Sequence, residues 1–190
     1  MEYSNSIALL INIELSEMLE NIGIPIDKLV VYLSAIHQYI EKRIKIECPQ
    51  KYNSVLDAHI AVWTCEHNYE KSNIANILKC IVDILNNIRL IGNEYSKVDI
   101  TVILKMHLGL AIGKVIYDNK RMFGDAIIKA GRNAKMANVN KVGIDFELLN
   151  KYELLEPKNK NIQRREDGGQ IIIMDVKEIE RITMVNEKHT

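Results

Sequence analysis

Residues 105–138 read KMHLGLAIGKVIYDNKRMFGDAIIKAGRNAKMAN, and they predict a strand, a turn, a second strand, a tight turn and a helix. The residues that lead into this stretch are apolar and partly β-branched, which is typical of a buried strand. Gly109 and Gly113 mark either a turn or a close approach of another backbone segment. Residues 115–117 predict the second strand, and the rest of the chain is organised around this unit.

The second half of the stretch predicts a helix. Residues 118–120 are polar and break the second strand, and Gly124 with Asp125 then begins the helix. Asp125 is expected to cap its free N–H groups. The helix has an apolar face of mostly small residues, made of Ile127, Ile128, Ala130, Gly131 and Ala134.

These residues resemble the core of the class III adenylyl/guanylyl cyclase homology domain. That family has G-I-H-T-G on one strand and F-G-D-x-V-N-x-A-x-R across a turn and a helix. Here residues 109–113 are G-L-A-I-G, and residues 123–125 are F-G-D, followed by Ala130 and Arg132. The pattern F-G-D-(x4)-A-x-R is fairly specific, whereas G-(x3)-G alone is weak.

The composition is that of an ordinary globular protein. Of the 190 residues, 47% are apolar and 26% are charged, which predicts a single domain over residues 1–190 with a sizeable core. Lysine plus arginine and aspartate plus glutamate both number 25, so no net charge favours nucleic acid or an anionic membrane.

Cysteine use and hydropathy indicate a cytoplasmic protein. Cys48, Cys65 and Cys80 are odd in number and lack C-x-x-C spacing, so neither a disulfide framework nor a zinc site is expected. No apolar run reaches about 18 residues, so no membrane span is predicted. The acidic N-terminus does not resemble a signal peptide.

Periodicity and turn signals predict the other elements. Strands are expected at residues 6–13, 52–56, 59–63, 141–145 and 171–176, with an edge strand at 177–182. Helices are expected at residues 15–21, 28–45 (capped by Asp27), 73–90 and 147–153. Residues 156–169 are predicted to form an exposed loop and residues 183–190 a frayed tail.

This order of elements predicts an α/β (α+β) sandwich, in which a mixed, mainly antiparallel sheet is covered by helices. The cyclase resemblance implies the same ferredoxin-like β-α-β-β-α-β core. It extends over residues 6–182.

The resemblance implies a site for two divalent metal ions, Mg²⁺ or Mn²⁺, held by two carboxylates. Asp57, in the turn of the predicted hairpin, lies at one of these positions, with Leu56 in place of a glycine. Asn12 lies at the other, where the family has F-x-D-I. An amide supplies an oxygen but no charge, so metal binding is expected to be weak or absent. Glu14 points to the same side of the strand and is an alternative ligand with shifted geometry.

The resemblance also implies nucleotide contacts. The family places an asparagine and a catalytic arginine four residues apart on the helix, where they hold the ribose and the transition-state phosphate. Ile128 and Arg132 lie at these positions, so only the phosphate contact is retained. The base-reading pair falls on Asn53 and Arg121, which match neither purine pattern and suit the carbonyl oxygens of a pyrimidine or a non-standard ligand. The candidates for the triphosphate-binding residue, by neighbourhood only, are Lys160, Arg164 and Arg165.

Each assignment has a structural alternative. Asp57 is also a common turn former, and Arg132 suits a salt bridge on the helix surface. Asp57 and His59 form Asp-x-His, which can bind metal, although a packed core histidine is the simpler interpretation. His107 is expected to be structural.

Three functions follow. The first is a degenerate nucleotidyl cyclase-like domain with weak or no cyclase activity, which forms a homodimer, binds a nucleoside triphosphate, or does both, in signalling. The second is an active cyclase of unusual base specificity, such as a pyrimidine cyclase of antiviral signalling. The third is a protein-interaction scaffold on the same fold, for which an exposed apolar patch away from the cleft would be evidence.

Overall fold

The computed structural model describes residues 2–15, 25–65, 71–95, 104–118, 121–154 and 162–187. Within these ranges the strands are β1 (Glu2–Leu15), β2 (Lys51–Val55), β3 (Ala58–Thr64), β4 (Leu104–Asp118), β5 (Arg121–Gly124), β6 (Lys141–Asp145), β7 (Ile162–Arg164) and β8 (Gln170–Met174). The helices are α2 (Ile26–Ile46), α3 (Lys71–Tyr95), α4 (Asp125–Met136), α5 (Phe146–Lys151) and α6 (Val176–Glu187). The helix expected at residues 15–21 lies almost wholly outside the described residues.

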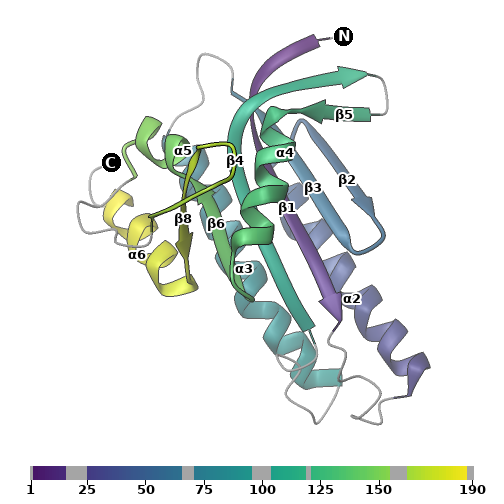
Figure 1. Cartoon of the computed structure of the whole chain (residues 1–190). Helices are drawn as coiled ribbons and strands as arrows, with labels where there is room; N and C mark the ends of the chain where they lie inside the picture. Colours follow the sequence, from purple (N-terminus) through teal and green to yellow (C-terminus); the bar gives the residue numbers. More distant parts are fainter. Residues whose placement is uncertain are drawn as a thin grey trace.

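The strands form one mixed sheet in the order β2-β3-β1-β4-β6-β8-β7, and β5 pairs with β4 (Figure 1). The pair β4·β6 is parallel, and the other pairs are antiparallel. The chain from β1 to β4 runs β-α-β-β-α-β. The predicted class, a mainly antiparallel sheet covered by helices, is therefore confirmed.

The two faces of the sheet carry different helices. On β1, Ile7, Leu9 and Ile11 enter the main core, which they share with α2 and α3. Ala8 lies between them on the opposite face and joins a smaller cluster with residues of α4. Figure 1 shows α4 in front of the sheet, and α2 and α3 behind it. The period-2 alternation of a strand thus gives one sheet two separate apolar layers.

The central prediction was wrong about a turn at Gly109–Gly113. β4 is a single strand of 15 residues that passes through both glycines. They instead mark the line where α4 lies on the sheet: a Cβ on Gly109 would come within 1.9 Å of the carbonyl oxygen of Ala130. The alternative, a close backbone approach, is the correct one.

The predicted helix caps were also wrong. Gly124 is the N-cap residue of α4 and Pro25 that of α2, and neither helix has a side-chain cap hydrogen bond. Asp27 and Asp125 lie in the first turns instead, where a carboxylate is favoured by the helix dipole. Asp125 makes an ion pair with Lys129, with 2.9 Å between Oδ2 and Nζ.

Three predictions near the C-terminus were wrong, in whole or in part. Residues 177–182 belong to α6 instead of an edge strand, and the helix continues through much of the predicted frayed tail. Asp175 and Glu178 form a reciprocal capping box, with each carboxylate accepting the other residue's backbone N–H. Part of the predicted exposed loop forms β7, and Arg165 beyond it is buried.

Candidate functional site

The two predicted metal positions lie beside each other. Asn12 on β1 is directly opposite Ala58 on β3, and the Ile13 N–H donates to the carbonyl oxygen of Asp57 at 2.9 Å. The hairpin turn lies at Leu56 and Asp57, one residue earlier than predicted, with Leu56 at a φ of 54°. β1 and the hairpin thus bring together residues that are 45 positions apart in the sequence.

The residues present fit a two-metal site poorly. Asp57 supplies a carboxylate and Asn12 only an amide. Glu14 Oε1 lies 3.8 Å from Lys105 Nζ, and its Oε2 lies 3.5 Å from His107 Nε2, so Lys105 on β4 already compensates part of its charge. Across the described ranges, no three His, Cys, Asp or Glu residues are grouped so that they could hold a metal ion.

His59 is a core residue. It is 1% exposed, its Nε2 is hydrogen-bonded to His37 Nδ1 at 2.8 Å, and its Nδ1 to the Tyr52 hydroxyl at 2.6 Å. Both ring nitrogens are therefore occupied within the protein. Burial and the neighbouring His37 lower the pKa of His59 to about 4, so the ring is neutral at pH 7.

The two predicted nucleotide residues of α4 face solvent. Ile128 is 56% exposed, and the side chain of Arg132 is 52% exposed. Arg132 Nη1 lies 2.6 Å from Asp167 Oδ2 in the β7–β8 turn, which is the salt bridge that the structural alternative expected. The Gly169 N–H, Arg165 and Arg132 together lower the pKa of Asp167 to about 2. A phosphate would have to share Arg132 with Asp167 or replace Asp167 as the partner of Nη1.

The structure does not join the predicted base-reading pair. Asn53 is exposed on β2, the edge strand next to β3. Arg121 is exposed on β5, which pairs only with β4 among the described strands. Within the described residues, no hydrogen bond or ion pair links the side chains of Asn53 and Arg121. Their role in base recognition stays a prediction.

Of the three candidates for a triphosphate-binding residue, Arg165 is excluded because its guanidinium group is already paired within the protein. Lys160 lies outside the described residues, and Arg164 is exposed on β7. The side chain of Arg165 is only 3% exposed, and its Nη1 donates at 2.9 Å both to Asp145 Oδ1 and to Asn133 Oδ1. Arg165 is committed to this buried network and cannot reach a phosphate without breaking it.

Sequence reasoning missed this network. Asn133 on α4, Asp145 at the end of β6 and Arg165 after β7 are all buried. Asn133 Nδ2 also donates to the Leu110 carbonyl oxygen at 2.9 Å, which ties the network to β4. The one signal of this network in the sequence was Asp145, a carboxylate residue at the end of an apolar strand.

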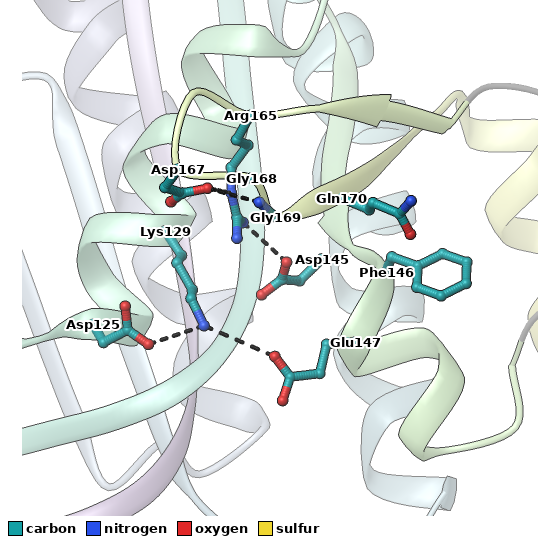
Figure 2. A pocket seen from close by; sticks show the side chains of 10 residues that line it. All are labelled: Asp125, Lys129, Asp145, Phe146, Glu147, Arg165, Asp167, Gly168, Gly169 and Gln170. Carbon is teal, nitrogen blue, oxygen red and sulfur yellow. Dashed lines mark hydrogen bonds and ion pairs between the residues drawn. The ribbon is translucent and has the colours of Figure 1, made fainter.

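A hollow of about 570 Å³ opens beside the network (Figure 2). The first turns of α4, the β6–α5 junction and the β7–β8 turn form its wall. Figure 2 shows Lys129 between Asp125 and Glu147, with Asp145 behind them.

The sequence comparisons find no protein-family model and no curated protein that matches the chain. Among solved structures, the chain is similar to the adenylyl cyclase CyaB from P. aeruginosa, with a TM-score of 0.71 at 12% identity, over 92% of this chain and 95% of that one.

Two further structures are similar as well. The guanylate cyclase domain of RhGC from Catenaria anguillulae in complex with GTP has a TM-score of 0.61 at 12% identity, over 91% of this chain and 97% of that one. The non-canonical dimeric guanylyl cyclase domain of the RhoGC fusion protein from the aquatic fungus Blastocladiella emersonii has a TM-score of 0.64 at 15% identity, over 91% and 97%. The chain therefore has the fold of adenylyl and guanylyl cyclase domains.

No described helix combines the length and the apolar composition that crossing a membrane requires.

Proposed function

We propose that the protein is a nucleotidyl cyclase-like domain with weak or no cyclase activity, which acts by dimerising and by binding a nucleoside triphosphate. The observation that carries the proposal is the placement of Asn12 beside the Asp57 turn on a cyclase fold. This adjacency supports a site at the metal position that the resemblance implies, with an amide in place of one of the two carboxylates.

Arg132 supports a role in binding phosphate. It lies on an exposed face of α4, and its partner Asp167 also accepts from the Gly169 N–H and from Arg165. Asp167 would therefore keep two donors if Arg132 turned to a ligand. Both remaining donors contact Oδ1, and because Asp167 is exposed, water can hydrogen-bond to Oδ2 once Arg132 has left it.

Exposed apolar residues on the hairpin, β5 and α4 support self-association. Leu56 in the hairpin turn is 91% exposed, Phe123 on β5 is 50% exposed and Ile128 on α4 is 56% exposed. The Blastocladiella domain, which has this fold, is found both as a non-canonical dimer and as a monomer, so the fold is compatible with self-association. In the dimer that we propose, the hairpin of one subunit and α4 of the other contribute to the same site.

Weak metal binding follows from the ligands. Asp57 supplies the single matched carboxylate, and hard cations such as Mg²⁺ are held mainly by carboxylate oxygens. We therefore propose that Arg132 contributes more than a metal ion to the binding free energy of a triphosphate. A cytoplasmic location, where nucleoside triphosphates are abundant, is part of the proposal.

A thermal-shift screen tests this function. ATP, GTP, CTP and UTP are each added with and without Mn²⁺, since a ligand that binds the native state raises its stability. We expect at least one triphosphate to raise the melting temperature, and Arg132→Ala to abolish the rise. Lys135→Ala, an exposed cation three residues further along α4 in its last turn, is the matched control and should leave it unchanged. A chain that no triphosphate stabilises would instead favour the scaffold function.

A further inference from the structure

The hollow beside α4 has an excess of negative charge. Its wall holds two cations, Lys129 and Arg165, and four carboxylates, Asp125, Asp145, Glu147 and Asp167. Even when Arg132, which pairs with Asp167 from outside, is counted, carboxylates outnumber cations. The field inside the hollow therefore attracts cations and repels anions.

One carboxylate oxygen in the hollow lacks a donor. The side chain of Asp145 is 2% exposed, and its Oδ1 accepts from Arg165 Nη1 at 2.9 Å. Its Oδ2 is buried without a hydrogen-bond partner in the described part of the chain, and Figure 2 shows this oxygen on the side of Lys129 and Glu147. Leaving a buried acceptor unpaired costs about 1–3 kcal/mol, and more for a charged group.

The pKa of Asp145 agrees with this arrangement. Burial raises it, although Arg165, Lys129 and the nearby Ile112 N–H oppose the rise. These neighbours therefore compensate the carboxylate incompletely, and the Ile112 N–H forms no hydrogen bond with Oδ2.

The nearest cation, Lys129, is already engaged. Its Nζ lies 2.9 Å from Asp125 Oδ2, 3.4 Å from the Ile112 carbonyl oxygen and 3.8 Å from Glu147 Oε2. The first two distances are within hydrogen-bond range, and the contact with Glu147 is an ion pair only. Lys129 makes no hydrogen bond to Asp145 Oδ2, which is left for a ligand to contact.

The walls are fixed before any ligand arrives. Arg165 is held by Asn133 and Asp145, and a Cβ on Gly169 would come within 2.1 Å of Arg165 Nη2, so the β7–β8 turn packs directly on the guanidinium group. Arg165 is thus not free to turn toward an anion.

We infer that this hollow binds a small organic cation with N–H donors, an alkylammonium or guanidinium compound, which donates to Asp145 Oδ2 and to Glu147. A metal ion fits less well, because the described residues form no group of three metal-binding side chains. The inference does not depend on nucleotide binding at Arg132.

Calorimetric titration of the full chain with agmatine, which has both an ammonium and a guanidinium group, tests the inference. Tetramethylammonium chloride at equal concentration is the control, since it has the charge without the donors. We expect saturable binding of agmatine in the millimolar range or tighter and none of tetramethylammonium. Absence of saturable agmatine binding up to about 10 mM would show that water satisfies Asp145, and would overturn the inference.

Two substitutions in the wall of the hollow should change the affinity for agmatine in opposite directions. Glu147→Gln removes an acceptor charge and should weaken agmatine binding about fivefold, whereas Lys129→Met removes a competing ammonium and should tighten it by a similar factor. Asp145→Asn should abolish binding, provided that circular dichroism shows a folded chain. If Glu147→Gln and Lys129→Met shift the affinity in the same direction, or not at all, agmatine binds elsewhere and the inference fails.

Discussion

At the scale of single residues, His59 links the hairpin to α2 through a buried contact that is sensitive to protonation. The pKa of His59 is lowered from 6.5 to about 4, and that of His37 is lowered as well. Between pH 6.5 and pH 4, His59 binds a proton in the unfolded chain but stays neutral in the folded chain. Stability is therefore complete above the unfolded pKa and is lost as the pH falls toward 4.

Urea unfolding between pH 7 and 4 measures this effect. The free energy of unfolding should fall by up to about 3 kcal/mol through His59 alone. His59→Gln, which cannot take up the proton, should show a clearly smaller fall over the same range, and the difference between the two curves isolates this residue. Parallel curves for wild type and variant would mean that His59 titrates normally.

The metal position also depends on one residue. Asn12→Asp restores a second carboxylate beside Asp57 and should strengthen Mg²⁺ binding about tenfold or more, the scale on which residues of metal sites act. Calorimetry measures the affinity. Asn86→Asp, which adds the same charge to an exposed position of α3, should have no such effect. Tight wild-type binding that survives Asp57→Ala would place the metal elsewhere.

Residue roles were the part of the site that the sequence predicted least. The adjacency of Asn12 and Asp57 was predicted through the resemblance, since both positions belong to its motifs. The contacts of Arg165 were not predictable, because Asn133, Asp145 and Arg165 lie in three separate segments and meet only in the folded chain. The charged residues around Arg165 would look the same in the sequence whether all of them were exposed to solvent or one arginine were buried.

At the scale of elements, the packing of α4 on β4 is the contact that places Arg132. Gly109→Ala would direct a Cβ to 1.9 Å from the Ala130 carbonyl oxygen and 2.5 Å from the Ala134 nitrogen. Both are backbone atoms, so α4 must move away. We expect a loss of about 1–3 kcal/mol or more in the free energy of unfolding, measured by urea denaturation.

Gly131→Ala is the matched control on the same helix. Its Cβ would meet only Leu10 Cδ1 at 3.8 Å, an ordinary contact. The substitution should stabilise the protein by up to about 1 kcal/mol through helix propensity. If both alanines had the same effect, the close approach at Gly109 would not be what fixes α4.

The success of the element predictions depended on whether the signal was local. The long helices and the hairpin were found because apolar periodicity and turn residues lie within each segment. The continuity of β4 was not predicted. In the sequence, a glycine that lets a helix approach a strand closely cannot be distinguished from a glycine that forms a turn. α6 was missed although its capping box is local: the run of isoleucines before it was extended as a strand.

At the scale of the whole molecule, we predict a homodimer in solution. Light scattering at tens of micromolar, where even a weak dimer forms, should give twice the 21.8 kDa chain mass. Leu56→Asp in the hairpin turn should shift the equilibrium to monomer, because it places a charge in the apolar contact. Val31→Asp, at an exposed position of α2 on the opposite face, should leave the dimer intact. A wild-type chain that is only monomeric would contradict a site shared between subunits.

The central claim is that this cyclase fold binds nucleotide with little or no turnover. Loss of one preorganised contact commonly costs about 10²–10³-fold in rate, and in the proposed site Asn12 stands in place of a metal carboxylate and Ile128 in place of a ribose ligand. Production of cyclic mononucleotides from each triphosphate with Mn²⁺ is therefore the most direct measurement. We predict little or no cyclic AMP or cyclic GMP from the wild type, and more from the double variant Asn12→Asp, Ile128→Asn. Robust wild-type production of any cyclic mononucleotide, abolished by Asp57→Ala, would contradict the claim and establish an active cyclase.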